Sequence, residues 1–252
     1  PAVSGTRPGG GKLTASKLQK LMAQAGHGSR RACEQIIREG RVTVNNQPAE
    51  IGLRADPQTD VILVDGHRLN PAQPLTYILF HKPVGVLCSA RSQGGWPTVT
   101  ELVESPVRLY PVGRLDLDSE GLVLLTNDGE LANQLTHPSW GHEKEYRVLL
   151  DQVPSEDQLR RWCEGVTLPD ARRTGPARAW MEADPGDGPW LRVVLTQGMK
   201  RQIRETAGTL GLKVKRLIRI RLGTLGLGDL SPGTWRDLTD REMILLRSAN
   251  ER

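Results

Sequence analysis

Apolar residues near the start of the chain recur with the spacing of two short helices. The first helix is predicted from Ser16, as its N-cap, to Gly26, and the second from Ser29, as its N-cap, to Gly40. We expect both helices to turn an apolar stripe toward a shared core. The stripes consist of Leu18, Leu21, Met22 and Ala25, and of Ala32, Cys33, Ile36 and Ile37.

After the second helix the pattern changes to short segments typical of strands. "RVTVNNQPA" (41–49) predicts a strand with a tight turn, and "VILVDGHRL" (61–69) predicts two strands joined by a DG turn. The proline-containing segment 70–76 is typical of a linker. Residues 16–69 are therefore expected to form a small α/β module, preceded by a flexible tail over residues 1–15.

Beyond residue 76, strands dominate the pattern. Apolar runs predict strands in "YILFHK" (77–82), "GLVLLT" (121–126), "KEYRVLL" (144–150) and "WLRVVLT" (190–196). Helical spacing predicts helices over 130–135, 155–165 and 200–211. Because helices and strands do not alternate regularly, we expect an α+β domain over residues 77–252 with a mixed, largely antiparallel sheet.

The composition excludes several classes of protein. The 252 residues contain no apolar run of 18 or more, so no membrane span is expected. The start of the chain lacks the apolar segment of a signal peptide. Cys33, Cys88 and Cys163 are too few and too scattered for a disulfide framework or a zinc site. We therefore expect a protein of the reducing cytoplasm.

Basic residues gather in two parts of the chain. Residues 1–54 hold nine lysines and arginines against three acids, a balance of +6, although the whole chain carries only +5. Residues 198–221 hold eight basic residues against one acid. Such clustering indicates a polyanionic partner such as nucleic acid, although it also fits ordinary solvated surfaces.

The stretch "GRLDLDSEGLVLLTNDG" (113–129) places three carboxylates within five positions. Asp116, Asp118 and Glu120 match the first, third and fifth positions of a calcium-binding EF-hand loop. That loop requires a bidentate glutamate at its twelfth position, where this chain has Asn127. A calcium site is therefore rejected, and the carboxylates remain candidates for chemistry.

The same stretch closely resembles the active-site segment of the RsuA/RluB-type ribosomal RNA pseudouridine synthases. Three further segments of that family occur in the family's order: "HKPVG" (81–85), "KEYRV" (144–148) and "TQGMKRQIR" (196–204). Residues 17–49 in addition resemble an S4 RNA-binding module. Within the family, "AGHGSRR" (25–31) is most similar to the members that modify the large ribosomal subunit.

This resemblance implies that Asp116 is the nucleophile that converts uridine into pseudouridine. The reaction breaks the N1–C1′ glycosidic bond, turns the bound uracil, and joins C5 to C1′. The resemblance implies that no metal or other cofactor is required. A carboxylate can either attack C1′ or remove the 2′ proton, and both routes remain open. The resemblance also implies that Tyr146 stacks against the uracil, and that Arg204 pairs with Asp116 in a site emptied of water.

Four other positions are expected to contact the substrate RNA. Arg114 is expected on the same side of a strand as Asp116, where it would fill the gap left by the flipped nucleotide. Leu217 is implied to pack on the base, although core packing is an equal alternative. Lys200 and Arg201 belong to the basic helix and are expected to bind the substrate.

Several titratable residues near these motifs receive no role in the reaction. Asp118 and Glu120 match no catalytic position, so we expect them to face solvent or to cap turns. His81, His137 and His142 show no metal-ligand spacing.

The S4-like module is expected to contact an RNA backbone through the basic face of its helices. Its candidate RNA-binding residues are Lys17, Lys20, Arg30, Arg31 and Arg38. For Arg30 and Arg31, an ordinary solvated position is an equal alternative.

Together these features predict a cytoplasmic, monomeric pseudouridine synthase that acts on 23S ribosomal RNA or on an assembly precursor of the ribosome. Modification of 16S ribosomal RNA is the alternative within the same class, because both kinds of enzyme share the catalytic motifs. A non-catalytic ribosomal-RNA-binding or ribosome-assembly protein is the alternative from another class. The joint presence of Asp116, Tyr146 and Arg204 argues against it.

Overall fold

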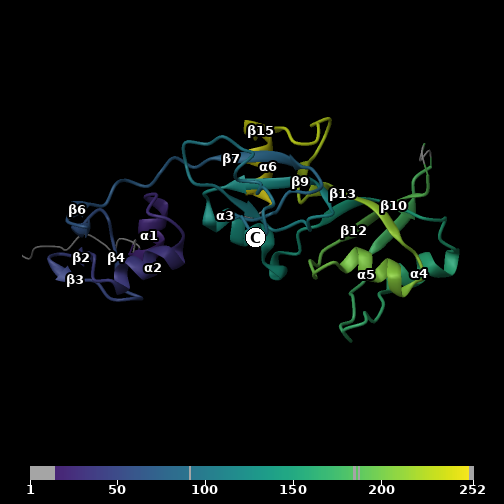
Figure 1. Ribbon diagram of the computed structural model, residues 1–252, viewed down its shortest axis with the longest axis horizontal. Helices are drawn as coiled ribbons and strands as arrows, with labels where there is room; N and C mark the ends of the chain where they lie inside the picture. The colour runs from purple at the N-terminus through teal and green to yellow at the C-terminus, as the bar shows by residue number, and fades with distance from the viewer. Residues whose placement is uncertain (1–14, 91, 184–185, 187, 250–252) are drawn as a thin grey trace, which may run out of the picture. The chain divides into compact units, whose positions relative to one another are not determined.

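The computed structural model describes residues 15–90, 92–183, 186 and 188–249. The chain divides into two compact units, Pro1–Pro74 and Leu75–Arg252, each with its own hydrophobic core (Figure 1). The predicted flexible tail over residues 1–15 lies, apart from Ala15, outside the described residues.

The first unit packs a pair of helices, α1 (Leu18–Gln24) and α2 (Arg30–Arg38), on a small sheet. The strands of this sheet lie in the order β3-β2-β5-β6. They are β2 (Val42–Val44), β3 (Gln47–Pro48), β5 (Ile62–Val64) and β6 (His67–Arg68), and a separate pair joins β1 (Ser16–Lys17) to β4 (Arg54–Ala55). The core contains the predicted residues Leu18, Met22, Cys33 and Ile37 together with Val42 and Ile62.

The two helices of this unit begin in different ways. The Ala32 N–H donates to the Ser29 hydroxyl at 3.1 Å, so the predicted cap of α2 is confirmed. The predicted cap at Ser16 is wrong, because Ser16 pairs with Ala55 in a β-ladder and α1 begins two residues later. The Leu18 N–H, which a capping group would otherwise satisfy, donates to the Leu53 carbonyl at 2.8 Å.

The second unit is built on a nine-stranded sheet, counted over the described ranges. Its order is β11-β12-β10-β13-β9-β7-β15, while β8 pairs with β9 and β14 with β13. The strands are β7 (Tyr77–Lys82), β8 (Tyr110–Val112), β9 (Glu120–Thr126), β10 (Lys144–Leu150), β11 (Arg178–Met181), β12 (Trp190–Leu195), β13 (Val214–Leu222), β14 (Leu225–Gly226) and β15 (Trp235–Asp237). The prediction of an α+β fold with a mixed, largely antiparallel sheet is confirmed.

One parallel pairing joins the two halves of this sheet. β9 meets β13 at two residue pairs, Glu120 with Ile218 and Gly121 with Arg219, whereas the other strand pairs of the described chain are antiparallel. Gly121 has a φ of +112°, and a Cβ there would lie 2.3 Å from the Arg219 carbonyl oxygen. The junction therefore requires glycine, because any side chain would push the strands apart.

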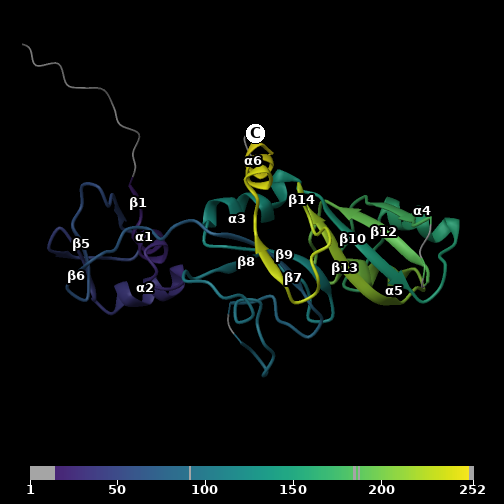
Figure 2. The ribbon, with the colours of Figure 1, turned by 90° about the horizontal axis from the view of Figure 1, so that it is seen from above.

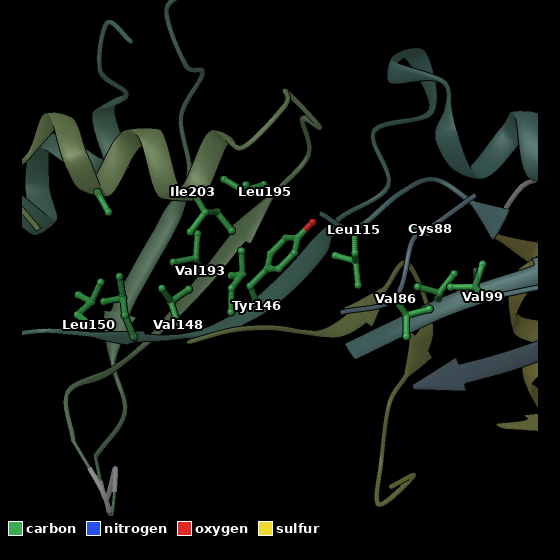
Figure 3. Packing of buried hydrophobic residues seen from close by; sticks show 14 of the residues in the cluster. Val86, Cys88, Val99, Leu115, Tyr146, Val148, Leu150, Val193, Leu195 and Ile203 are labelled. Carbon is green, nitrogen blue, oxygen red and sulfur yellow. The ribbon is translucent and has the colours of Figure 1, made fainter. Parts of the chain in front are cut away.

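Helices cover parts of both faces of the sheet. On one face α4 (Glu156–Glu164) and α5 (Gln202–Thr209) pack on β10 and β12, and the loop over residues 83–109 packs on β7 and β9. Figure 3 shows Val86 and Val99 of that loop beside Leu115. On the opposite face α3 (Gly129–Thr136) and α6 (Asp240–Ser248) pack on β7 and β9 (Figures 1 and 2).

A single turn of 3-10 helix, η1 (Pro138–Trp140), follows α3. None of the helices in the described ranges combines the length and the apolar character needed to traverse a bilayer.

Candidate active site

The predicted nucleophile lies in a turn and not in a strand. Between β8 and β9 the chain leaves the sheet, and the Ser119 N–H donates to the Asp116 carbonyl at 3.1 Å. This bond closes a turn with Leu117 and Asp118 at its centre. The expectation that Arg114 and Asp116 share one side of a strand is therefore wrong. The turn leaves 35% of the Asp116 side chain exposed.

The segment that follows β7 supports this turn. The Gly85 N–H donates to the Leu117 carbonyl at 2.9 Å. The Lys82 ammonium donates to the Ser119 carbonyl at 2.7 Å and to the Pro83 carbonyl at 2.9 Å. Lys82 is fully buried, and this burial lowers the pKa of its ammonium to about 8. The "HKPVG" segment thus fixes the backbone on both sides of the turn.

The turn borders a cleft with a volume of about 320 Å³. Side chains from the turn, from β10, from the start of α5 and from β13 meet there. The predicted site residues that line the cleft are Arg114, Asp116, Tyr146, Lys200, Arg201 and Leu217. Arg204 is not among the lining residues. The convergence of several chemically active side chains in one concave site is typical of an active site.

Arg201, and not Arg204, lies within ion-pair distance of the predicted nucleophile. Arg201 Nη1 is 3.9 Å from the Asp116 carboxylate, and the same guanidinium binds Asp118 in a bidentate manner at 3.1 and 3.0 Å. Arg204 Nε lies 3.2 Å from the Asp118 carboxylate, and Arg204 Nη2 donates to the Asp118 carbonyl at 2.7 Å. The expected pair of Arg204 with Asp116 is therefore wrong, because the turn presents Asp118 to both guanidinium groups.

These contacts set the charge of the groups beside Asp116. Burial opposes ionisation of Asp118, but the hydrogen bonds from Arg201 and the charge of Arg204 outweigh it and lower the pKa of this carboxyl. The hydrogen bonds to Asp118 raise the pKa of Arg201, whereas burial lowers the pKa of Arg204. Asp118 is exposed, as expected from the sequence, and it is at the same time held by two arginines.

Tyr146 projects from β10 with only 9% of its surface exposed. Its ring belongs to the same core cluster as Val148 and Val193. Figure 3 shows the ring between these residues and Leu115, with the hydroxyl directed toward the Leu115 side. A register shift between Glu145 and Tyr146 in the pairing with β13 marks an irregularity at this point, a feature often found next to active sites.

Four of the eight basic residues in the second basic cluster of the sequence form ion pairs with acids in the described part of the chain. Arg216 Nη2 donates to Glu120 at 3.1 Å, and Arg221 pairs with Glu143 and Glu145 at 3.0 and 2.9 Å. Glu120 is only 6% exposed, so the expectation that it faces solvent or caps a turn is wrong. Strand pairing brings glutamates of distant segments onto these arginines, which charge counting along the chain does not reveal.

The prediction from sequence omits two cations that line the cleft, Arg219 of β13 and Lys144 of β10. Arg219 is 2% exposed, and its Nε donates to the Leu122 carbonyl at 2.8 Å. An arginine within the apolar run "LIRIRL" was the available signal, but such residues are more often surface charges. Other polar residues that border the cleft include His137, His142, Gln197 and Gln202, of which the two histidines had received no role.

The basic residues predicted to bind RNA remain available in the first unit. Lys17, Arg30, Arg31 and Arg38 are exposed, and Lys20 is half-buried. Arg38 donates to the Gln35 side chain. Within the described part of this unit, the ion pairs are those of Arg41 with Glu39 and Asp65. The charges of the predicted RNA-binding residues are therefore not compensated by neighbouring acids.

The described residues contain no group of three or more His, Cys, Asp or Glu side chains that could hold a metal ion. The cleft offers one carboxylate, one phenol and several cationic groups. A carboxylate can act as a nucleophile or as a base, and the cations favour an anionic substrate.

Comparison with known protein families gives two matches. Residues 76–207, just over half of the chain, match the family described as RNA pseudouridylate synthase. Residues 16–61 match the family described as S4 domain. The two matches fall in the two units of the structure.

Individual proteins are similar over most of the chain. A protein of Aquifex aeolicus (strain VF5) named as an RNA pseudouridine synthase is 38% identical over 236 residues, which cover 92% of this chain and 94% of that protein. The ribosomal large subunit pseudouridine synthase B of Salmonella typhi is 39% identical, over 93% of this chain and 83% of that protein. A crystal structure titled pseudouridylate synthase matches with a TM-score of 0.66 and 28% identity, over 91% of this chain and 99% of that one.

Proposed function

This chain belongs to the RNA pseudouridine synthase family, and from that premise we propose that it isomerises a uridine of 23S ribosomal RNA in the cytoplasm. The family assignment establishes the enzyme class and RNA as the substrate. The similarity to a large-subunit pseudouridine synthase over 93% of the chain supports 23S ribosomal RNA as the specific target. The observation that carries the mechanism is the cleft in which Asp116, Tyr146 and Arg201 meet.

Asp116 is the group that acts at C1′ of the target uridine. Its carboxylate stands on a turn fixed by backbone hydrogen bonds, so its position is set before the substrate binds. The electrons of the N1–C1′ bond leave with the uracil, and the later C5–C1′ bond requires loss of the C5 proton and protonation of N1. Arg201 Nη1 lies 3.9 Å from this carboxylate and supplies a positive charge at the same side of the cleft.

Tyr146 provides the wall on which the uracil stacks and turns. The ring is fixed in the core cluster, which suits a rigid stacking surface, and its hydroxyl points toward the side of the turn (Figure 3). Leu217, which is buried and also lines the cleft, serves both the core and the base-binding wall. Arg204 acts through Asp118 as a positioning residue and does not touch the substrate.

Contacts with the RNA outside the reacting nucleotide come from both units. Arg114 at the cleft fills the place of the flipped uridine, and Lys200 and Arg201 contact nearby phosphates. In the S4 domain the uncompensated cations bind the ribosomal RNA backbone. They are Lys17, Lys20, Arg30, Arg31 and Arg38.

Mapping of pseudouridine in ribosomal RNA from cells that lack this gene tests the proposal. We expect one 23S uridine to remain unmodified, and modification to return with the wild-type gene but not with Asp116→Asn. The asparagine keeps the size of the side chain and removes its negative charge. Loss of a 16S site would favour the alternative target, and an unchanged pattern in both RNAs would refute the proposal.

A further inference from the structure

One of the three nitrogens in the Arg219 guanidinium makes no hydrogen bond to the described residues. Its Nε donates to the Leu122 carbonyl at 2.8 Å, and its Nη1 donates to the Arg114 carbonyl at 3.4 Å. Its Nη2 is buried and has no hydrogen-bond partner among the described residues. A buried donor without a partner is costly, and such groups are commonly completed by a bound ligand or water.

Arg219 also differs from the neighbouring arginines of β13 in its charge environment. Arg216 pairs with Glu120, and Arg221 pairs with Glu143 and Glu145. No ion pair of Arg219 occurs within the described part of the chain, although Arg219 is the most deeply buried of the three arginines. The positive charge at the wall of the cleft is therefore not neutralised by an acid of the protein.

A second cation stands beside it without an acid. Lys144 is half-buried, and its ammonium donates to the His142 carbonyl at 3.2 Å. Burial and the nearby charge of Arg219 both lower the pKa of Lys144. Asp116 lines the same cleft, but within the described residues its ion-pair partner is Arg201. Two cations that repel each other thus line one cleft, and among the described residues neither has an acid as its ion-pair partner.

We propose that Arg219 and Lys144 form a subsite for a phosphate of the RNA backbone next to the target uridine. This inference rests on the proposed function, because the uracil ring is neutral and only the backbone of the substrate supplies the missing anion. A phosphate accepts several hydrogen bonds and suits a guanidinium together with an ammonium. With the phosphate anchored on β10 and β13, the ribose C1′ of the same nucleotide is held at a fixed distance from the Asp116 turn.

The test uses the full-length enzyme and a ribosomal RNA hairpin whose uridine the wild-type enzyme modifies. Lys144→Gln removes one charge from the subsite without creating a cavity. The control, Lys215→Gln, removes one charge from an exposed position of β13, the strand of Arg219, outside the cleft. We expect Lys144→Gln to raise KM about tenfold with kcat within about twofold, and to reduce the slope of binding against salt by about 1. Lys215→Gln should change neither parameter.

Hairpins with a single neutral methylphosphonate in place of one phosphate flanking the uridine identify the anion. At one of these positions the neutral linkage should weaken hairpin binding by the wild type about tenfold. Hairpin binding by Lys144→Gln, which is already weaker, should stay nearly unchanged. Equal losses in both proteins would overturn the inference, because they would show that the two cations bind a different anion. Wild-type KM and salt slope in Lys144→Gln would overturn it as well.

Arg219→Lys provides a second measurement. Lysine keeps the charge but cannot reach both carbonyls and the phosphate, so KM should rise while the far-ultraviolet circular dichroism stays that of the wild type. A variant that is folded and binds the hairpin normally would contradict the assignment of Arg219. The hairpin is chosen because the wild-type enzyme modifies it. If the target uridine does not lie in 23S ribosomal RNA, a different hairpin is used, and the outcomes expected for the subsite stay the same.

Discussion

Replacing Lys82 by methionine would remove a buried charge from beneath the catalytic turn. Methionine has a similar length and no ammonium, so the core remains filled. The Ser119 and Pro83 carbonyls lose their donor at the same time. The structure makes a quantitative prediction for the pH dependence of this change, because Lys82 is fully buried and its pKa is lowered to about 8.

The magnitude follows from the difference between the folded and unfolded pKa values. In the unfolded chain the pKa of Lys82 returns to 10.5, about 2.5 above its folded value of about 8. Each unit corresponds to 1.36 kcal/mol, so the total effect is about 3 kcal/mol. Between these two pH values the unfolded chain binds more protons than the folded one. The penalty for burying the charge is therefore complete below pH 8 and disappears as the pH rises toward 10.5.

The free energy of unfolding of the wild type, relative to Lys82→Met, should thus increase by about 3 kcal/mol from about pH 7.5 to about pH 10.5. Guanidinium titrations followed by tryptophan fluorescence measure this difference. The six tryptophans all lie between residues 96 and 235, so the signal reports the second unit alone. Both proteins should carry Cys88→Ala, since burial raises the pKa of this nearby thiol and its ionisation would otherwise add to the pH dependence.

Lys215→Met serves as the control for the loss of a lysine as such, because Lys215 is exposed on β13 and does not touch the turn. Parallel curves for the wild type and Lys82→Met across this range would refute the reasoning. They would show that the ammonium of Lys82 is solvated and that the turn does not rest on a buried charge.

Three further predictions concern the site and the S4 domain. Asp118→Asn should lower kcat by about tenfold to a hundredfold, because Arg201 loses its bidentate partner. Tritium release from RNA labelled at uridine C5 measures kcat, and an unchanged value would show that Asp118 is dispensable. Tyr146→Phe should bind a substrate hairpin as the wild type does, whereas Tyr146→Ala should lose about 1–3 kcal/mol of stacking; equal affinities in a filter-binding titration would exclude stacking. Joint replacement by alanine of four cations of the S4 domain should reduce the salt slope of ribosomal RNA binding by about 3, and an unchanged slope would contradict this role. These cations are Lys17, Lys20, Arg30 and Arg31.

The sequence predicted the fold well where apolar residues kept a regular period. Both helices of the S4 domain and the four strands predicted beyond residue 76 are present. β13 was not predicted, because basic residues interrupt the apolar run "VKRLIRIRL" (214–222). The partners of these arginines are glutamates on other strands, such as Glu120 for Arg216. The charges of the arginines are therefore paired only once the sheet has formed.

The site was predicted at the level of motifs and not of contacts. Asp116, Tyr146 and Arg201, which come from three separate motifs, line one cleft. Motif position did not reveal that Arg204 pairs with Asp118, since this depends on how the turn faces α5. Treating residues 114–118 as a strand gave the wrong relation between their side chains, because the turn breaks the two-residue period.

The cleft lies across the short pairing between β9 and β13, the line along which the two half-sheets would move relative to each other. Asp116 belongs to the half-sheet that contains β9, whereas Tyr146 and Arg219 belong to the half-sheet that contains β10 and β13. Any flexing along this line changes the separation between the nucleophile and the stacking wall while each half stays rigid. An RNA that binds both half-sheets holds the separation between them fixed. The stiffness of this two-residue junction, together with the bonds from Arg201, Arg204 and Arg219 that cross it, therefore determines how precisely the reacting atoms are aligned.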